Sequence, residues 1–92
     1  MNGVRGETAL VIDGVPRRLC LTLGALAEIE SELGCETLAE LDTRMRQLSA
    51  RDLSTVLKAL LRGGGETIEP ENVGPGDAAR AVAEAFVRGL GN

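Results

Sequence analysis

Residues 7–34 read ETALVIDGVPRRLCLTLGALAEIESELG, and within this stretch the apolar residues change from a strand-like spacing to a helix-like one. Two runs of β-forming residues flank Asp13-Gly14. This dipeptide favours a tight type I′ turn, because both central positions of that turn need a positive φ. The sequence therefore predicts a β-hairpin over residues 7–22, in which Ile12 pairs with Val15, Leu10 with Arg17 and Thr8 with Leu19.

The two faces of this predicted hairpin differ in character. One face is apolar and is expected to be buried under helices 23–33 and 50–61; it carries Leu10, Ile12, Val15, Leu19 and Leu21. The other face is mixed and carries Ala9, Val11, Arg18 and Cys20. Pro16 has no amide hydrogen and suits an unpaired strand edge. A two-stranded ribbon is marginally stable alone, so the hairpin needs helices or a partner to cover it.

Apolar residues at spacings of three and four predict helices at about 23–33, 38–47, 50–61 and 78–90. Thr22, Thr37, Ser49 and Asp77 are the expected N-caps, and Gly34 is the expected stop of the first helix. The residues expected to face inward are Leu23, Leu26, Ala27, Ile29, Leu33, Leu38, Leu41, Met45, Leu48, Leu53, Val56, Leu57, Leu60, Leu61, Ala79, Val82, Ala83, Phe86 and Leu90. The predicted fold class is α+β, with an N-terminal β-hairpin followed by a bundle of about four short helices in a single domain over 1–92.

Composition excludes several classes of function. The net charge of -4 and the absence of Trp and Tyr argue against a nucleic-acid binder, which needs cations for phosphates and aromatic rings for bases. No apolar run approaches the roughly 20 residues that cross a bilayer, so we expect no membrane partner and a cytoplasmic location. The chain has no histidine, and its two cysteines are expected to remain unbridged thiols.

No motif indicates catalysis. Neither cysteine has a base nearby in sequence, and the run Gly63-Gly64-Gly65 lacks the lysine of a phosphate-binding loop. Four acids in or beside residues 66–77 could hold Mg²⁺ or Ca²⁺, but they lack the order of a calcium loop, and we favour a solvated acidic loop; they are Glu66, Glu69, Glu71 and Asp77. We expect no enzyme activity, no cofactor and no metal.

Three segments resemble one family of short proteins. They are RLCLTLGALAEIESELG (18–34), LSARDLSTVLKALLRGGG (48–65) and, more weakly, AVAEAF (81–86). The family is found in gene transfer agents and related tailed phages, where its genes lie between those of the major tail tube and the tape measure. Its members begin with a hairpin, which here runs from Gly6-Glu7 to Asp13-Gly14. The family carries two labels, tail tube protein and tail assembly chaperone.

The resemblance implies a function in tail assembly. A tube wall of sheet needs several strands per subunit, whereas this chain has two strand-like runs, so the chaperone label fits better. We expect the chain to bind the tape-measure protein and to assist assembly of tail tube subunits. The alternative is a structural tail component, which would be virion-associated, and a small regulator unrelated to tails is a third possibility.

The mixed second face of the hairpin and the neighbouring surface of the first helix suggest where partners bind. The candidate partner-binding residues are Ala9, Val11 and Arg18 in the hairpin and Gly24, Glu28 and Glu32 in helix 23–33. Weak self-association through the hairpin is also expected, because its outer edges retain unpaired backbone groups. If the interface lies elsewhere, the exposed faces of helices 38–47 and 78–90 are the next candidates.

Overall fold

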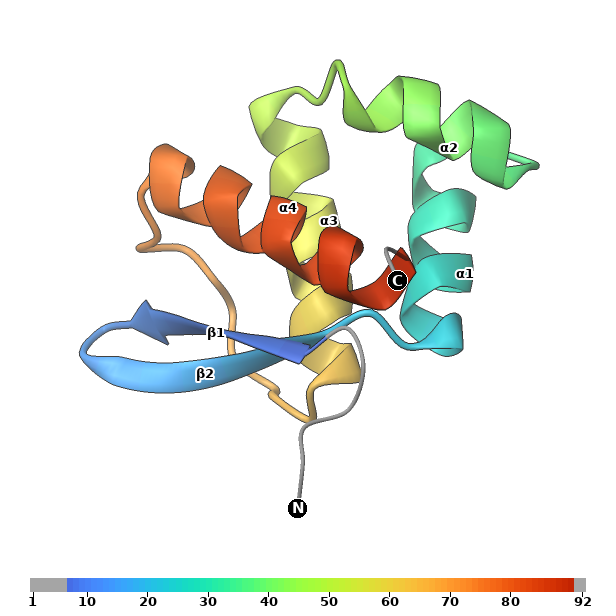
Figure 1. Ribbon diagram of the computed structural model, residues 1–92. Coiled ribbons are helices and arrows are strands. Elements are labelled where there is room, and N and C mark those ends of the chain that lie inside the picture. Colours follow the sequence, from blue (N-terminus) through green and yellow to red (C-terminus); the bar gives the residue numbers. More distant parts are fainter. Residues whose placement is uncertain (1–6, 91–92) are drawn as a thin grey trace.

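The computed structural model describes residues 7–90, so Gly6 lies outside the described range. The elements are β1 (Glu7–Ile12), β2 (Val15–Cys20), α1 (Leu23–Leu33), α2 (Leu38–Met45), α3 (Ala50–Gly63) and α4 (Pro75–Leu90). In Figure 1 the hairpin lies below α4, α3 passes behind both, and α1 and α2 lie on the side away from the hairpin turn. The α+β fold with a hairpin followed by four helices is therefore confirmed.

The hairpin has the predicted register. β1 and β2 are antiparallel, with Ile12 opposite Val15 and Leu10 opposite Arg17. Asp13 and Gly14 have φ values of 54° and 79°, as a type I′ turn requires. Val15 was predicted to be buried but is exposed. Ile12, opposite Val15, is buried where α4 packs on β1, whereas α4 makes less contact with β2, which carries Val15.

Local hydrogen bonds explain where the first three helices begin. The side chain of Thr22 accepts from the amide of Ala25 at 3.0 Å, and the side chain of Ser49 accepts from the amide of Asp52 at 3.0 Å. Thr37 caps α2 in the same way, accepting from the amide of Glu40 at 3.1 Å. These contacts satisfy amides that have no partner within the first turn of a helix.

The fourth helix begins earlier than predicted. α4 starts at Pro75, and the amide of Ala78 already donates to the carbonyl of Gly74 at 2.9 Å. Proline is favoured at the first helical position because its missing amide hydrogen is not needed there. Asp77 therefore lies inside the first turn and accepts from Arg80 at 2.9 Å, so the prediction that it caps the helix was wrong.

The core lies between the hairpin, α3 and α4, with α1 packed against α3. The prediction that helix 23–33 covers the hairpin was wrong, because α4 takes that place over β1. The fully buried large side chains are Leu19, Ile29, Leu41, Val56, Leu57, Leu60 and Leu61. Across residues 7–90, no helix has the length and hydrophobicity needed to cross a membrane.

Several residues predicted to face inward are exposed. They are Leu23, Ala27, Leu38, Ala79, Ala83 and Leu90. The buried side of α4 is instead formed by Ala78, Ala81, Val82 and Ala85. Small alanine side chains let this helix approach β1 and α3 closely. α4 thus presents a second apolar side, which faces away from the hairpin.

Candidate docking site

An open groove of about 620 Å³ lies between α2 and α4. The α2–α4 groove is lined by Leu38, Leu41, Asp42, Met45, Leu48, Leu53, Ala79, Val82, Ala83, Phe86, Val87 and Leu90. Asp42 is the one charged residue in this lining. Soluble proteins rarely expose a contiguous apolar patch of this kind without a use for it, so the groove is the candidate docking site.

The α4 wall of the groove contains the largest apolar side chain of the protein. Phe86 is the only aromatic residue of the protein, and it is half-buried in this wall. Val87 and Leu90 are further toward solvent, with Val87 67% exposed. Ala79 and Ala83 contribute small, exposed side chains to the same wall. An apolar partner would gain most of its buried area along this wall.

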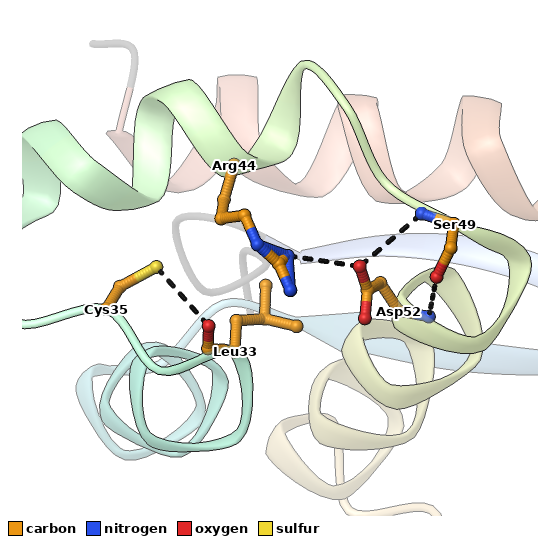
Figure 2. A network of polar contacts seen from close by, with 5 residues as sticks. All are labelled: Leu33, Cys35, Arg44, Ser49 and Asp52. Atoms are coloured by element: carbon orange, nitrogen blue, oxygen red, sulfur yellow. Dashed lines mark hydrogen bonds and ion pairs between the residues drawn. The ribbon is translucent and has the colours of Figure 1, made fainter.

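A polar corner between α2 and α3 holds the other wall in place (Figure 2). The Nη1 atom of Arg44 donates to the Oδ2 atom of Asp52 at 3.0 Å, and the amide of Ser49 donates to the same oxygen at 3.4 Å. Figure 2 shows the Arg44 side chain reaching from α2 toward α3 beside Leu33. Of the α2 residues, only Leu41 is fully buried. Leu41 and the partly buried Met45 attach α2 to the core, and the Arg44–Asp52 ion pair links it to α3.

The two outer edges of the hairpin are not equivalent. On β2, the amide of Arg18 donates to Glu66 Oε2 at 3.1 Å, and the Nη1 atom of Arg17 donates to Glu66 Oε1 at 3.1 Å. Gly63 and Gly64 lie directly against the carbonyls of β2, because a Cβ atom at either position would overlap the backbone oxygen of Cys20 or Arg18. The chain itself therefore occupies the β2 edge.

The β1 edge has a different environment. Ile12 and Val15 flank a two-residue turn and form a hydrogen-bonded pair, so the backbone groups of Ala9 and Val11 point away from β2. Among the hydrogen bonds of residues 7–90, none joins these outward amides to another segment. Within the described chain the β2 edge is therefore covered, whereas the outward backbone groups of Ala9 and Val11 on β1 have no hydrogen-bond partner in another segment.

A family model described as "Phage tail tube protein, GTA-gp10" matches residues 5–89. The chain belongs to this phage tail family. The match spans nearly the whole sequence and includes the hairpin, the first three helices and all of α4 except Leu90. No curated protein and no solved structure matches the chain. The resemblance inferred from the three sequence segments is confirmed: the chain belongs to a family of phage tail proteins.

The sequence-predicted partner residues of this tail protein lie on two elements, the hairpin and α1. Ala9, Val11 and Arg18 are exposed on the outward face of the hairpin, with Val11 63% exposed. Arg18 forms an ion pair with Glu7 at 3.6 Å. None of the three lines the groove. The partner role of this hairpin set stays a prediction.

The second set lies on α1, which packs on α3 rather than on the hairpin. Gly24 and Glu32 are exposed, whereas Glu28 is half-buried and forms an ion pair with Arg62 of α3. This contact gives Glu28 a part in holding α1 against α3. A role for the α1 set in binding also stays a prediction.

Sequence reasoning missed the groove because it assigned the groove residues to the core. The spacing of Leu38, Met45, Ala83, Phe86 and Leu90 is helical, and an amphipathic pattern alone does not say which apolar side meets the core. One feature of the sequence could have indicated the groove. Segment 75–90 carries apolar residues around more of its circumference than one packing face requires. Such excess indicates a second contact surface on the same helix.

Within residues 7–90, the pKa values of Glu66 and Cys20 are shifted. The amide of Arg18, and then the guanidinium of Arg17, lower the pKa of Glu66 by hydrogen bonding to its charged form. Burial, aided by the nearby charge of Glu7, raises the pKa of the Cys20 thiol, with Arg18 opposing. A raised pKa disfavours the nucleophilic thiolate. Cys35 lies near the polar corner, with its Sγ atom 3.9 Å from the carbonyl oxygen of Leu33 (Figure 2).

The sequence predicted that the whole acidic segment after α3 is solvated. The structure shows that part of it contacts the hairpin. Glu66 holds the β2 edge, and Glu69 forms an exposed ion pair with Lys58 at 3.4 Å. In the part of the chain that the structure describes, no three metal-ligating side chains of the Cys, Asp or Glu type are grouped for a metal ion. The prediction of a purely solvated loop was therefore wrong for Glu66.

Proposed function

We propose that this member of the phage tail family is a tail assembly chaperone, without enzymatic activity, that binds the tape-measure protein until tail tube subunits polymerise around it. The observation that carries the proposal is the occupied β2 edge. A tube wall built by continuing a sheet from subunit to subunit needs an open edge on both sides of each subunit's sheet. Here the segment from Gly63 to Glu66 covers one of the two edges.

Two further features support a transient holding role. The α2–α4 groove offers an apolar surface to an unassembled partner, and the net charge of -4 favours solubility of the loaded complex. In this proposal the chain binds its partner in the cytoplasm during assembly and is released as the tube forms. The partners of this activity are the tape-measure protein and the tail tube subunits.

A structural tail subunit is the second candidate function, because the family description itself reads "tail tube protein". In that case the chain would contribute to the tube through surfaces other than a continuous sheet. The helical faces of α2 and α4 would then contact neighbouring subunits permanently rather than hold a partner for a limited time.

Co-expression tests whether the chain binds the tape-measure protein and keeps it soluble. The tape-measure protein from the same tail gene cluster is expressed alone and together with this chain, and its soluble fraction is measured. The proposal predicts that co-expression raises the soluble fraction and that the two proteins elute together in size-exclusion chromatography. Equal solubility in both cases, with no joint elution, would refute it.

A further inference from the structure

The two walls of the α2–α4 groove are attached to the fold over very different areas. The buried side of α4 includes Ala78, Val82 and Ala85, and this helix packs on the hairpin and on α3. In α2, Leu41 is the buried residue, and Met45 is partly buried against the core. The α4 wall is therefore fixed by a broad contact, whereas the α2 wall is fixed by a narrow one.

The position of α2 in the fold also sets it apart from the other helices. α3 packs against α1, α4 and β2, whereas the main packing contact of α2 is with α1. The groove of about 620 Å³ lies between α2 and α4. Figure 1 shows α2 at the top of the molecule, with the hairpin below and short connections to α1 and α3. A movement of α2 therefore needs no change in how the hairpin, α3 and α4 pack on one another.

Among the hydrogen bonds and ion pairs of residues 7–90, one contact joins α2 to another helix. The Nη1 atom of Arg44 donates to the Oδ2 atom of Asp52 in α3 at 3.0 Å, and the two side chains are 39% and 21% exposed (Figure 2). A second ion pair, between Arg46 and Asp42, lies within α2 and its C-terminal cap and is more exposed. Partly buried, charge-assisted hydrogen bonds are stronger than exposed ion pairs. The Arg44–Asp52 contact is therefore the polar link between α2 and α3.

α2 is too short to be stable by itself. It spans Leu38–Met45, which is 8 residues, and isolated helices shorter than roughly 12–15 residues are marginal in water. Its helical state therefore depends on the packing of Leu41 and Met45 and on the link to α3. Segments with few buried apolar contacts open at a lower free-energy cost than the core of the same domain.

We infer that α2 is a movable wall of the groove, which detaches from the fold while the hairpin, α1, α3 and α4 remain folded. The Arg44–Asp52 pair controls how often α2 detaches. When it does, the groove loses one wall, and the groove residues of α4 become more exposed. This inference concerns the fold itself and does not depend on the proposed function.

Hydrogen exchange of the purified chain tests the inference. The protection factor of each amide is measured, so that differences in intrinsic exchange rate between variants are removed. Amides of α2 should have lower protection factors than the slowest amides of α3 and α4, which exchange when the whole domain unfolds. Three variants then identify the opening reaction that exposes the α2 amides.

The first two variants compare the arginines of α2 and its cap. Arg44→Gln removes the ion pair with α3 but leaves Asp52 in its cap contact with Ser49. It should lower the protection factors in α2 about fivefold or more, because a hydrogen bond between charged groups is lost. The matched control, Arg46→Gln, removes the same charge but breaks only the exposed pair with Asp42. It should lower these protection factors about twofold or less.

The third variant destabilises the domain at a distance from α2. Ile12 is the last residue of β1 and is 2% exposed, and α2 lies on the side away from the hairpin turn (Figure 1). Ile12→Val should lower the protection factors of the slowest core amides about threefold to tenfold. Those of α2 should not change, because the contacts of Ile12 are the same whether α2 is attached or detached.

Two results would overturn the inference. If Ile12→Val lowers the protection factors of α2 and of the core by the same factor, α2 opens only when the whole domain unfolds. If Arg44→Gln and Arg46→Gln have equal effects on α2, the pair with Asp52 does not hold this helix on α3.

Discussion

Replacing Gly63 with alanine should destabilise the protein, although the same change stabilises most helices. Gly63 is the last residue of α3, and an added Cβ atom would overlap the carbonyl oxygen of Cys20 and lie 3.3 Å from the Cβ atom of Ala25. The overlapped atom belongs to the backbone of β2 and cannot rotate away. The end of α3 and β2 would have to move apart.

The magnitude follows from two opposing terms. Alanine is favoured over glycine by about 1 kcal/mol inside a helix. Overpacking a filled site costs about 1–3 kcal/mol, and the backbone contact at Gly63 places this substitution at the upper end. We expect Gly63→Ala to lower the free energy of unfolding by about 1–2 kcal/mol, which is a drop in Tm of about 4–8 °C for each kcal/mol.

Gly76→Ala is the matched control. Gly76 is also helical, lies in the first turn of α4, and has no atom within 4 Å of an added Cβ. Its substitution should raise stability by about 0.5–1 kcal/mol. Urea unfolding followed by circular dichroism measures both variants, with the m-value expected to stay unchanged. If Gly63→Ala is as stable as Gly76→Ala, the end of α3 does not lie against β2, and the occupied edge loses its main support.

Three other predictions test the core, the covered edge and the open edge. Leu57→Ala should lower the free energy of unfolding by about 2–5 kcal/mol, because Leu57 is 2% exposed within the core; a loss below about 1 kcal/mol in urea would contradict this. The pKa of Glu66 is lowered by folding, so its stabilising contribution should be present above the unfolded pKa and decline as pH falls toward the lower folded value. Glu66→Gln should reduce this acid-dependent change in Tm, and the exposed control Glu71→Gln should leave it intact. Val11→Lys should abolish weak self-association in sedimentation equilibrium while leaving the helical signal unchanged, and an unaltered dimer would place self-association away from β1.

The local structure of this chain was predictable because its signals are local. Asp13-Gly14 specified the turn and the register of the hairpin, and Thr22, Thr37 and Ser49 specified three helix starts. Each signal depends on hydrogen bonds or backbone angles within a few residues. The α+β fold class followed from the order of these elements.

The arrangement of the elements was less predictable. Periodicity showed that residues 78–90 are amphipathic. It did not show which alanines would be buried: Ala78, Ala81 and Ala85 lie in the core, whereas Ala79 and Ala83 are exposed. That choice depends on the angle at which α4 crosses the hairpin. The role of Glu66 was missed for the same reason, since its partners Arg17 and Arg18 are 48 or more residues away in sequence. The candidate site was therefore found on the helices that sequence reasoning had ranked second, after the hairpin.

The protein composition of purified particles tests the central claim most directly. Quantitative mass spectrometry would compare the copies of this chain per tail tube subunit in particles and in the producing cells during assembly. A chaperone that leaves as the tube polymerises should be abundant in the cells and strongly depleted from purified particles. A fixed stoichiometric ratio to the tube subunit or the tape-measure protein in the particles would contradict the account and identify the chain as a structural tail component.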